Sequence, residues 1–436
     1  MKLTTARNIG GLWAVQIVKM VASIAVSVFV IRHLGPQQYG VFGIAAAVVT
    51  PFTALVGLPQ GSLIVRELAA RGEAGASGVL STAFALKLAG GLAQLVLSLI
   101  AVLAMGYSFD VQVVTLFTAL AYLAAPFTVI GSALEFDNRF DRVAAVEFAI
   151  AIGSLALRAA LVVADANLFW FAASALVDAL VQIGMYLVLN PRRGQIFSRQ
   201  AVAPGIAWTF VRDGWPLLLT GMAMAIYTRS DVIFISKFLG EQQTGYYTAA
   251  IRITEVLYYF PGVIASIAFP ALAQQRRSDL GAYYALLTKS CGAAFWLGVL
   301  LAAGLTVAAP IAFPLLFGAK FAPSVPVIQI MAWSIPVIGM SQAFGASLTM
   351  EYATRVPLYA ALCAAGISVA LNLLLIPRAG LVGAAVVTVL SPLASLFVTF
   401  LIYKDARLFA ALARALSPVY LLELVRLVVV AMRRWR

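Results

Sequence analysis

The stretch Ser230–Val256, SDVIFISKFLGEQQTGYYTAAIRITEV, decides the fold because it joins two long apolar segments through a short turn at Leu239-Gly240. A turn of the same pattern occurs 205 residues earlier, and the two copies align without a gap. The matching residues are Leu34 and Leu239, Gly35 and Gly240, Gln37 and Gln242, Gln38 and Gln243, Gly40 and Gly245, and Phe42 and Tyr247. A helix–turn–helix unit that recurs at about half the chain length predicts an internal duplication.

The composition indicates a protein embedded in a lipid bilayer. Of the 436 residues, 63% are hydrophobic and 11% are charged, and the mean hydropathy is +0.98. A soluble domain has roughly 25% charged residues, so this chain has too few to cover a water-facing globule. The formal net charge of +13 does not predict nucleic-acid binding, because a basic patch needs a water-exposed surface. We expect the excess in cytoplasmic loops.

Twelve apolar runs are each about 20 residues or longer, which is enough to cross a hydrocarbon layer of about 30 Å. They lie at about 8–34, 37–58, 77–105, 111–134, 143–164, 167–190, 213–236, 244–270, 281–308, 326–349, 357–376 and 380–403. Backbone groups inside a bilayer must be hydrogen-bonded within the protein, so these runs should be helices. The sequence therefore predicts an all-α integral membrane protein with two six-helix repeats, 1–190 and 213–403, joined by a cytoplasmic linker at 191–212.

The distribution of basic residues predicts the orientation. An even number of spans puts both termini on one side, and the segments on that side hold 20 of the 30 Lys and Arg residues. The opposite loops hold 4, which predicts cytoplasmic termini. The last segment, 404–436, is basic and amphipathic. We expect an interfacial helix there; a helix packed on the bundle and a disordered tail are the alternatives.

Two six-helix halves with the same orientation should be related by an axis along the membrane normal. They would enclose a central cleft, and rocking of one half against the other would give alternating access. The two Leu-Gly turns then fall on the outer face. Glycine supplies the backbone freedom that such tight turns need.

Charged residues within the predicted spans are candidates for a binding site, since each costs from about 2.5 to well above 10 kcal/mol near the bilayer centre. We predict that Lys19, Lys87, Arg229 and Arg252 line the cleft and bind an anionic group, with phosphate favoured. Arg252 has an alternative, an ion pair with Glu255 on the same helix face. Arg229 and Asp231 point in roughly opposite directions, so at least one should face the cleft or another helix.

Three acidic residues in the spans, Asp178, Asp231 and Glu255, are candidates for coupling transport to protons. Coupling to Na⁺ and downhill movement remain open alternatives. We expect no cofactor, no catalytic residue and no metal centre. The two cysteines, Cys291 and Cys363, lie in apolar segments without metal-ligand spacing. We expect both to be small buried hydrophobic side chains.

Three motifs resemble those of bacterial polysaccharide flippases. LGPQQYGVF at Leu34–Phe42 resembles their first-turn motif, and Asp231–Tyr247 followed by Arg252 resembles their second-half motif. NLLLIPRAGLVGAAVVTVLS at Asn372–Ser391 is similar to their C-terminal motif. This family belongs to a superfamily that also contains MATE-type exporters and the lipid II flippase.

The resemblance implies a MATE-like fold in the bacterial inner membrane. It also implies translocation of undecaprenyl-pyrophosphate-linked oligosaccharide, for O-antigen, exopolysaccharide or a related glycan, from the cytoplasmic to the periplasmic leaflet. A polysaccharide polymerase and glycosyltransferases would be its partners, and a monomer is the default. The motifs do not identify substrate-binding residues.

Two other functions remain alternatives. An ion-coupled exporter of small cationic molecules should have an acidic cleft, whereas the charges within the spans here lean basic. A membrane polymerase or glycosyltransferase should carry catalytic residues on a sizeable extramembrane loop. The longest predicted outer loop, 309–325, has only Lys320 as a charged residue, which argues against an enzyme.

Overall fold

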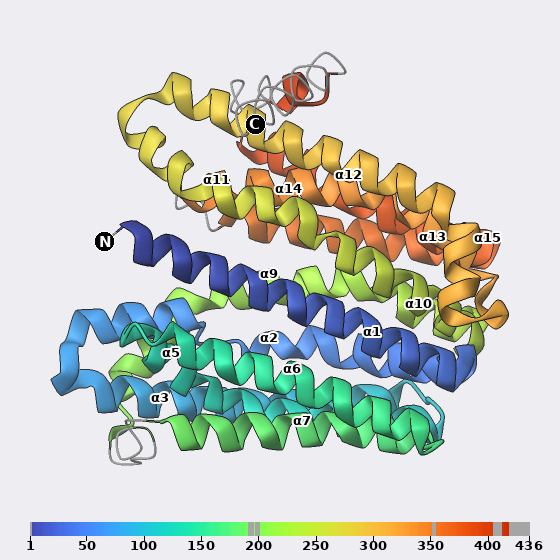
Figure 1. Ribbon diagram of the computed structural model, residues 1–436, viewed down its shortest axis with the longest axis horizontal. Helices are drawn as coiled ribbons and strands as arrows, with labels where there is room; N and C mark the ends of the chain where they lie inside the picture. The colour runs from blue at the N-terminus through green and yellow to red at the C-terminus, as the bar shows by residue number, and fades with distance from the viewer. Residues whose placement is uncertain (1, 191–195, 197–200, 351–354, 404–411, 418–436) are drawn as a thin grey trace. The chain divides into compact units, whose positions relative to one another are not determined.

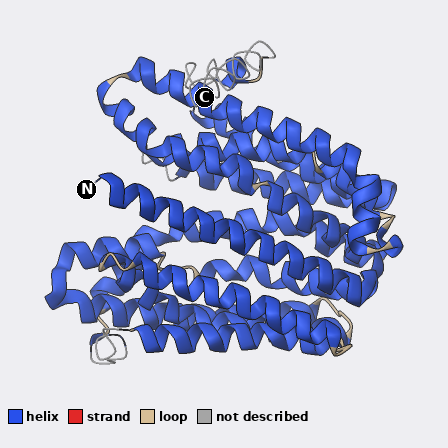
Figure 2. Cartoon of the chain, viewed as in Figure 1, coloured by secondary structure: helices blue, strands red, loops and turns tan. Residues whose placement is uncertain are grey.

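The computed structural model describes residues 2–190, 196, 201–350, 355–403 and 412–417, and this part of the chain consists of helices and loops without a strand (Figures 1 and 2). The predicted all-α fold is thus confirmed for the described residues. The first elements are α1 (Lys2–Val49), η1 (Thr50–Phe52), α2 (Thr53–Val56), α3 (Gly61–Ala104), α4 (Phe109–Ala121), η2 (Tyr122–Phe127), α5 (Thr128–Phe136), α6 (Phe140–Val163) and α7 (Leu168–Leu189). They are followed by α9 (Pro204–Leu239), α10 (Glu241–Leu257), α11 (Tyr259–Ser278), α12 (Leu280–Phe317), η4 (Ala319–Phe321), α13 (Ser324–Met331), α14 (Ser334–Met350) and α15 (Arg355–Tyr403).

Glycines interrupt three of the longest helices. Gly35 in α1 has φ 70° and ψ 178°, Gly72 in α3 has φ 63°, and Gly380 in α15 has φ 58°. A residue with a Cβ rarely adopts these angles, so glycine allows the chain to leave the helix at each point. Each of these elements therefore consists of two helices, and Figure 1 shows the chain reversing direction after the first arm of α1.

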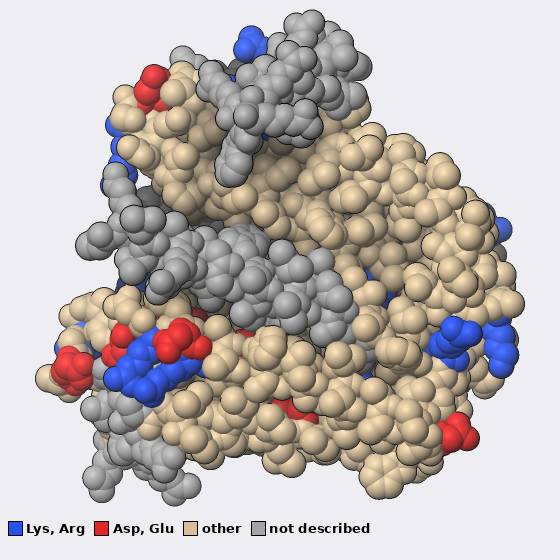
Figure 3. Space-filling view, viewed as in Figure 1, with Lys and Arg blue, Asp and Glu red and all other residues tan. Residues whose placement is uncertain are grey.

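Nine helical segments among the described residues are long and apolar enough to cross a membrane. The two longest have enough residues for more than one crossing: Ser27–Ala104 has 78 residues and Val356–Ile402 has 47. In Figure 3 most charged side chains lie toward the left and right edges of the visible face, and broad uncharged areas lie between them. The described part of the chain is thus that of a multi-pass membrane protein.

The chain divides into two compact units. Unit 1 comprises Met1–Ala225 and Gly240–Gly245, and unit 2 comprises Ile226–Leu239 and Tyr246–Arg436. The long helix α9 therefore contributes to both units. It begins at Pro204, inside the segment predicted as a linker, and proline at a first helical position is pre-organised for the helix.

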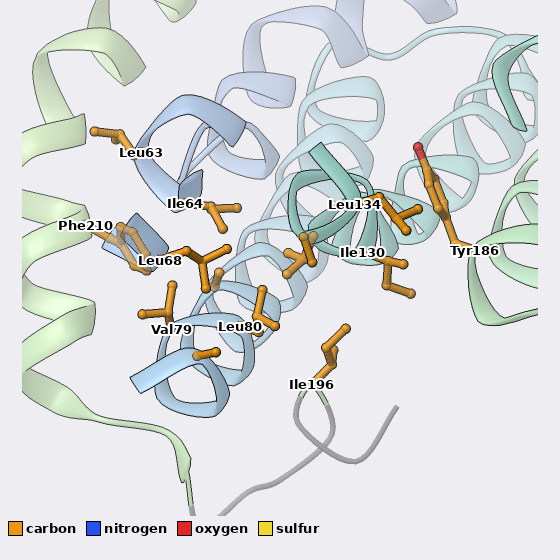
Figure 4. Close-up of a cluster of buried hydrophobic side chains, with 14 of the residues drawn as sticks. Leu63, Ile64, Leu68, Val79, Leu80, Ile130, Leu134, Tyr186, Ile196 and Phe210 are labelled. Atoms are coloured by element: carbon orange, nitrogen blue, oxygen red, sulfur yellow. The ribbon is translucent and has the colours of Figure 1, made fainter. Parts of the chain in front are cut away.

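One hydrophobic cluster of unit 1 is built mainly from α3, α5 and α9, and another mainly from α1, α4 and α7. Leu80, Ile130 and Leu134 are fully buried in the first cluster, and Phe210 of α9 joins it beside Leu68 of α3 (Figure 4). Lipid tails are as apolar as these side chains, so van der Waals packing stabilises the unit more than exclusion of water does. The first part of α9 is held in unit 1 by this packing.

Close helix packing in unit 2 rests on glycine–proline contacts. A Cβ on Gly298 of α12 would lie 2.6 Å from the Pro336 Cα of α14, and one on Gly339 would lie 2.5 Å from the Pro261 Cβ of α11. Small residues at such crossings let helices in a membrane approach closely. Larger side chains at Gly298 or Gly339 would force α11, α12 and α14 apart.

The predicted tail, 404–436, lies outside the described residues except for 412–417. Leu412 and Ala415 are buried in a cluster with α12 and α14, and the indole of Trp296 donates to the Ala415 carbonyl at 3.2 Å. This short piece therefore packs on unit 2, as in one of the alternatives considered for the tail.

Candidate functional site

The charged residues of α9 and α10 come together because the Gly240 turn folds one helix back on the other. Gly240 has φ 87°, and α9 ends and α10 begins on either side of it. Arg229 of α9 and Glu255 of α10 form an ion pair with Nη2 and Oε1 2.6 Å apart. Their side chains are 24% and 33% exposed, so the pair is accessible from one side. The structure therefore pairs Glu255 with Arg229 of the preceding helix, whereas the sequence offers Arg252 as a partner on the same helix.

Asp231 lies two residues further along α9 and has a different set of hydrogen-bonding partners. Its side chain is buried, with 4% of the residue exposed. The Tyr247 phenol of α10 donates to Oδ2, the Thr388 hydroxyl of α15 lies 3.4 Å from the same oxygen, and the Val232 amide donates to Oδ1 at 2.8 Å. All three hydrogen-bonding partners are neutral groups.

A second polar layer adjoins Asp231 through Ser230. The Asn372 amide donates to the hydroxyls of Ser230 at 3.3 Å and Ser368 at 3.4 Å, and Ser368 donates to the Tyr227 carbonyl at 3.2 Å. Asn372 is fully buried, and its Oδ1 has no hydrogen-bond partner in the described part of the protein. Buried carbonyl oxygens are normally satisfied, so this oxygen has unused capacity to accept a proton donor or a cation.

The two layers unite two of the sequence motifs. Asp231 and Tyr247 begin and end the second-half motif, whereas Asn372 and Thr388 lie within the motif Asn372–Ser391. The Gly380 break divides α15, and residues from both arms reach α9. Asp231 is a predicted site residue, whereas the sequence alone does not single out its neighbours Tyr247, Ser368, Asn372 and Thr388. Their presence in motifs at fixed spacing was the signal that could have found three of them.

The remaining acidic candidate, Asp178 of α7, is paired in unit 1. Arg158 of α6 donates to Asp178 Oδ2 at 2.9 Å, and Ser154 donates to the same oxygen at 3.0 Å. The two charged side chains are 20% and 22% exposed. Asp178 is therefore neutralised locally by a neighbouring helix, an arrangement that stabilises the contact between α6 and α7.

The other basic candidates lie in different places. Lys87 of α3 is buried, and its ammonium group donates to the Val56 carbonyl at the end of α2 over 3.4 Å. That hydrogen bond uses one of three donors. Arg252 is half-buried on α10. Lys19 lies on α1, where its side chain is outside the described part of the structure. Lys87 belongs to unit 1, whereas Arg229 and Arg252 belong to unit 2.

The described residues hold no group of three or more His, Cys, Asp or Glu side chains that could bind a metal ion. A cation at Asp231 would instead have one carboxylate and neutral oxygens as ligands. Such a set suits a proton or a weakly bound monovalent ion better than a transition metal, which prefers imidazole and thiolate ligands.

Comparison with known families identifies the class of protein. Residues 29–326 match the family described as polysaccharide biosynthesis protein. The chain belongs to this family. A curated relative, the probable flippase AglR of Haloferax volcanii, is 24% identical over 382 residues, which cover 84% of this chain and 76% of the relative.

The fold is that of membrane transporters. The lipid II flippase MurJ in an inward closed conformation matches with a TM-score of 0.75 and 13% identity, over 95% of this chain and 92% of that one. A MATE multidrug transporter of the MOP superfamily in an inward-facing conformation matches with a TM-score of 0.66 and 17% identity, over 90% and 95% of the two chains. These likenesses show that the chain shares the fold of the two solved transporters.

Proposed function

We propose that this protein moves polyprenyl-pyrophosphate-linked oligosaccharide, with undecaprenyl as the carrier, from the cytoplasmic to the periplasmic leaflet of a bacterial inner membrane. The observation that carries the proposal is the match of residues 29–326 to the polysaccharide biosynthesis family, in a chain whose fold is that of MurJ. A polymerase and glycosyltransferases would work before and after it, and the protein would act as a monomer that catalyses no covalent step.

The proposed mechanism is alternating access between two six-helix halves. Splitting α1, α3 and α15 at Gly35, Gly72 and Gly380 divides the described helices in a way that accommodates twelve spans. Gly35 and Gly240, which are equivalent in the sequence repeat, have nearly the same backbone angles, with ψ 178° and 177°. Both observations support duplicated halves in one orientation, with cytoplasmic termini according to the charge bias.

Further breaks in the helices agree with the duplication. The 3-10 turn at Thr50–Phe52 and the break at Tyr258 lie about one repeat length apart. The 3-10 segment Tyr122–Phe127 and the break between α13 and α14 are related in the same way. Equivalent breaks give each half the same places at which a helix can bend during the cycle.

The anionic pyrophosphate would be bound by the basic residues of the spans, Lys19, Lys87, Arg229 and Arg252. Arg229 is held by Glu255 but remains partly exposed, so a pyrophosphate could replace the carboxylate as its partner. Lys87 uses one long hydrogen bond and has two further donors. In this proposal, exchange of an internal acid for the substrate phosphate lowers the cost of bringing the headgroup into the membrane.

Asp231 is the proposed site of ion coupling. Asp178 and Glu255 each pair with an arginine, whereas Asp231 accepts hydrogen bonds from neutral groups and has Arg229 only as a charged neighbour. A buried carboxylate with neutral partners gains most from binding a proton or Na⁺, because the bound ion neutralises the charge. The Thr388 hydroxyl would supply a further oxygen, and Asn372 Oδ1 in the adjoining layer has an unused one.

The substrate proposal is tested in a strain in which this protein is the only flippase for its surface polysaccharide. Single replacement of Lys19, Lys87, Arg229 and Arg252 by alanine should lower surface-polysaccharide output at normal protein level. Lys289, which is exposed on α12, is the matched control. Full output from all four variants would contradict binding by a cationic cleft.

A second candidate, export of small molecules, is favoured by the likeness to the MATE transporter, whose TM-score is 0.66. The two functions differ in what the deletion strain shows. Loss of polysaccharide with unchanged drug tolerance supports the flippase. Loss of drug tolerance with unchanged polysaccharide supports the exporter.

A further inference from the structure

The two repeated turns contact each other through their backbones. A Cβ added to Gly40 of α1 would lie 1.9 Å from the Glu241 carbonyl oxygen and 2.9 Å from the Gly245 amide nitrogen. A Cβ added to Gly245 of α10 would lie 1.7 Å from the Pro36 carbonyl oxygen and 3.0 Å from the Pro36 Cα. Both glycines are buried. Any side chain at either position would push one backbone away from the other.

This contact is reciprocal. In the sequence repeat, Gly40 is equivalent to Gly245, and Pro36 is equivalent to Glu241. Gly40 contacts Glu241 of the second copy, and Gly245 contacts Pro36 of the first copy. A contact in which position i meets j while j meets i is the pattern of a two-fold interface. The two copies of the turn therefore form a self-complementary interface within one chain.

A side-chain hydrogen bond adds to the contact at the second turn. The Ser108 hydroxyl donates to the Glu241 carboxylate at 2.7 Å, which ties the second turn to the loop before α4. The segment Gly240–Gly245 groups with unit 1, although the chain on both sides of it belongs to unit 2. The chain thus leaves unit 2 at Leu239, contributes the turn Gly240–Gly245 to unit 1, and returns to unit 2 at Tyr246.

We propose that the Gly40–Gly245 contact is a reversible interlock that closes the transporter on the face of the two turns and parts when that face opens. Glycine is required only in the closed state, because only there do the two backbones touch. A methyl group at either position should therefore destabilise the closed state selectively. The inference rests on the proposed alternating access, but its first test does not depend on the substrate.

The first experiment measures accessibility in the full chain with Cys291→Ala and Cys363→Ser. Thr244, which is fully buried beside Gly245, becomes the reporter through Thr244→Cys. Labelling with a membrane-impermeant maleimide should be slow in this parent and about tenfold faster with Gly40→Ala or Gly245→Ala, given the usual cost of overpacking. Gly184→Ala is the matched control, since nothing lies within 4 Å of a Cβ there.

The double variant Gly40→Ala/Gly245→Ala distinguishes one shared contact from two local defects. If the two glycines form one shared contact, either substitution already opens it, and the double variant should be labelled at a rate close to that of the faster single variant. Unchanged labelling in both single variants, or a double variant whose effect is the product of the two single effects, would overturn the proposal.

The second experiment changes no glycine, so it remains decisive if the alanine variants misfold. Gln38→Cys and Gln242→Cys place thiols at exposed positions of the two turns. A reversible bis-methanethiosulfonate cross-linker should block transport, and reduction should restore it. Full transport while cross-linked would overturn the interlock. A labelling response without movement of lipid-linked oligosaccharide would instead leave the interlock intact and refute the proposed substrate.

Discussion

The phenol of Tyr247 donates a hydrogen bond to the buried carboxylate of Asp231, and the two residues lie on helices that the Gly240 turn folds together. Tyr247 is itself fully buried and also lies 2.6 Å from the Thr388 hydroxyl. The phenol therefore connects α9, α10 and α15 at one point. Its loss would leave a buried carboxylate with fewer donors.

We expect Tyr247→Phe to lower the free energy of unfolding by about 1–3 kcal/mol, the usual cost of an unsatisfied buried polar group. Thermal unfolding of the purified protein in detergent measures the effect. Tyr359→Phe is the control, because that tyrosine is 50% exposed and its change should be small. Equal losses in the two variants would show that the hydrogen bond to Asp231 contributes nothing specific.

Asp231→Asn should abolish the response of transport to an imposed ion gradient while the protein remains folded. Asparagine keeps the size of the side chain but cannot exchange a proton, and it binds a cation more weakly than a carboxylate. Transport in vesicles with an imposed proton or Na⁺ gradient checks this. Asp213→Asn, near the start of α9, serves as the control and should respond like the parent. A normal response from Asp231→Asn would exclude this residue as the coupling site.

The ion pair of Arg229 and Glu255 should show energetic coupling in a double-mutant cycle. We expect about 0.5–3 kcal/mol between Arg229→Gln and Glu255→Gln, the range found for residues in direct contact. Arg229→Gln combined with Asp178→Asn is the control, since Asp178 has Arg158 as its own partner, and the two effects should add. Thermal unfolding gives the free energies. Additive effects for Arg229 and Glu255 would mean that the contact is not maintained in solution.

The ion pair of Arg66 and Asp213 should be sensitive to salt. It has an Nη2–Oδ2 distance of 2.5 Å, but its side chains are 52% and 26% exposed. Exposed pairs contribute about 0–1 kcal/mol and are screened by ions. Arg66→Ala should lower the unfolding temperature at low ionic strength and have a smaller effect at 1 M salt, where the Debye length is about 3 Å. An effect that does not change with salt would indicate a packing role for Arg66.

Much of the fold could be predicted from the sequence because a bilayer restricts the choices. Long apolar runs must become helices, and the positive φ of Gly35 and Gly240 is what the repeated Leu-Gly turns require. The start of α9 was harder to place. Residues 204–212 contain Arg212 and follow a basic stretch, so their hydropathy does not mark them as helix, whereas Pro204 and packing by Phe210 make them helical.

The candidate site could be predicted only in part, since spacing along one helix gives direction but not partners. The separation of two residues along α9 predicts that Arg229 and Asp231 have different partners, and they do. The sequence spacing does not predict the partner of Glu255, because that partner depends on how tightly the turn at Gly240 folds α10 onto α9. Hydroxyl and amide groups such as Thr388 and Asn372 carry no charge signal in an apolar helix, so only their contacts in space assign them to the site.

One measurement decides whether this protein is a lipid-linked oligosaccharide flippase. The purified protein is reconstituted into vesicles that contain polyprenyl-pyrophosphate-linked oligosaccharide, and the fraction accessible to an added glycan-modifying enzyme is followed with time. We predict that the protein moves the lipid between leaflets, that Asp231→Asn moves it without response to an ion gradient, and that empty vesicles do not move it. Equal accessibility with and without the protein, at an imposed gradient and with folded protein, would contradict the proposed function.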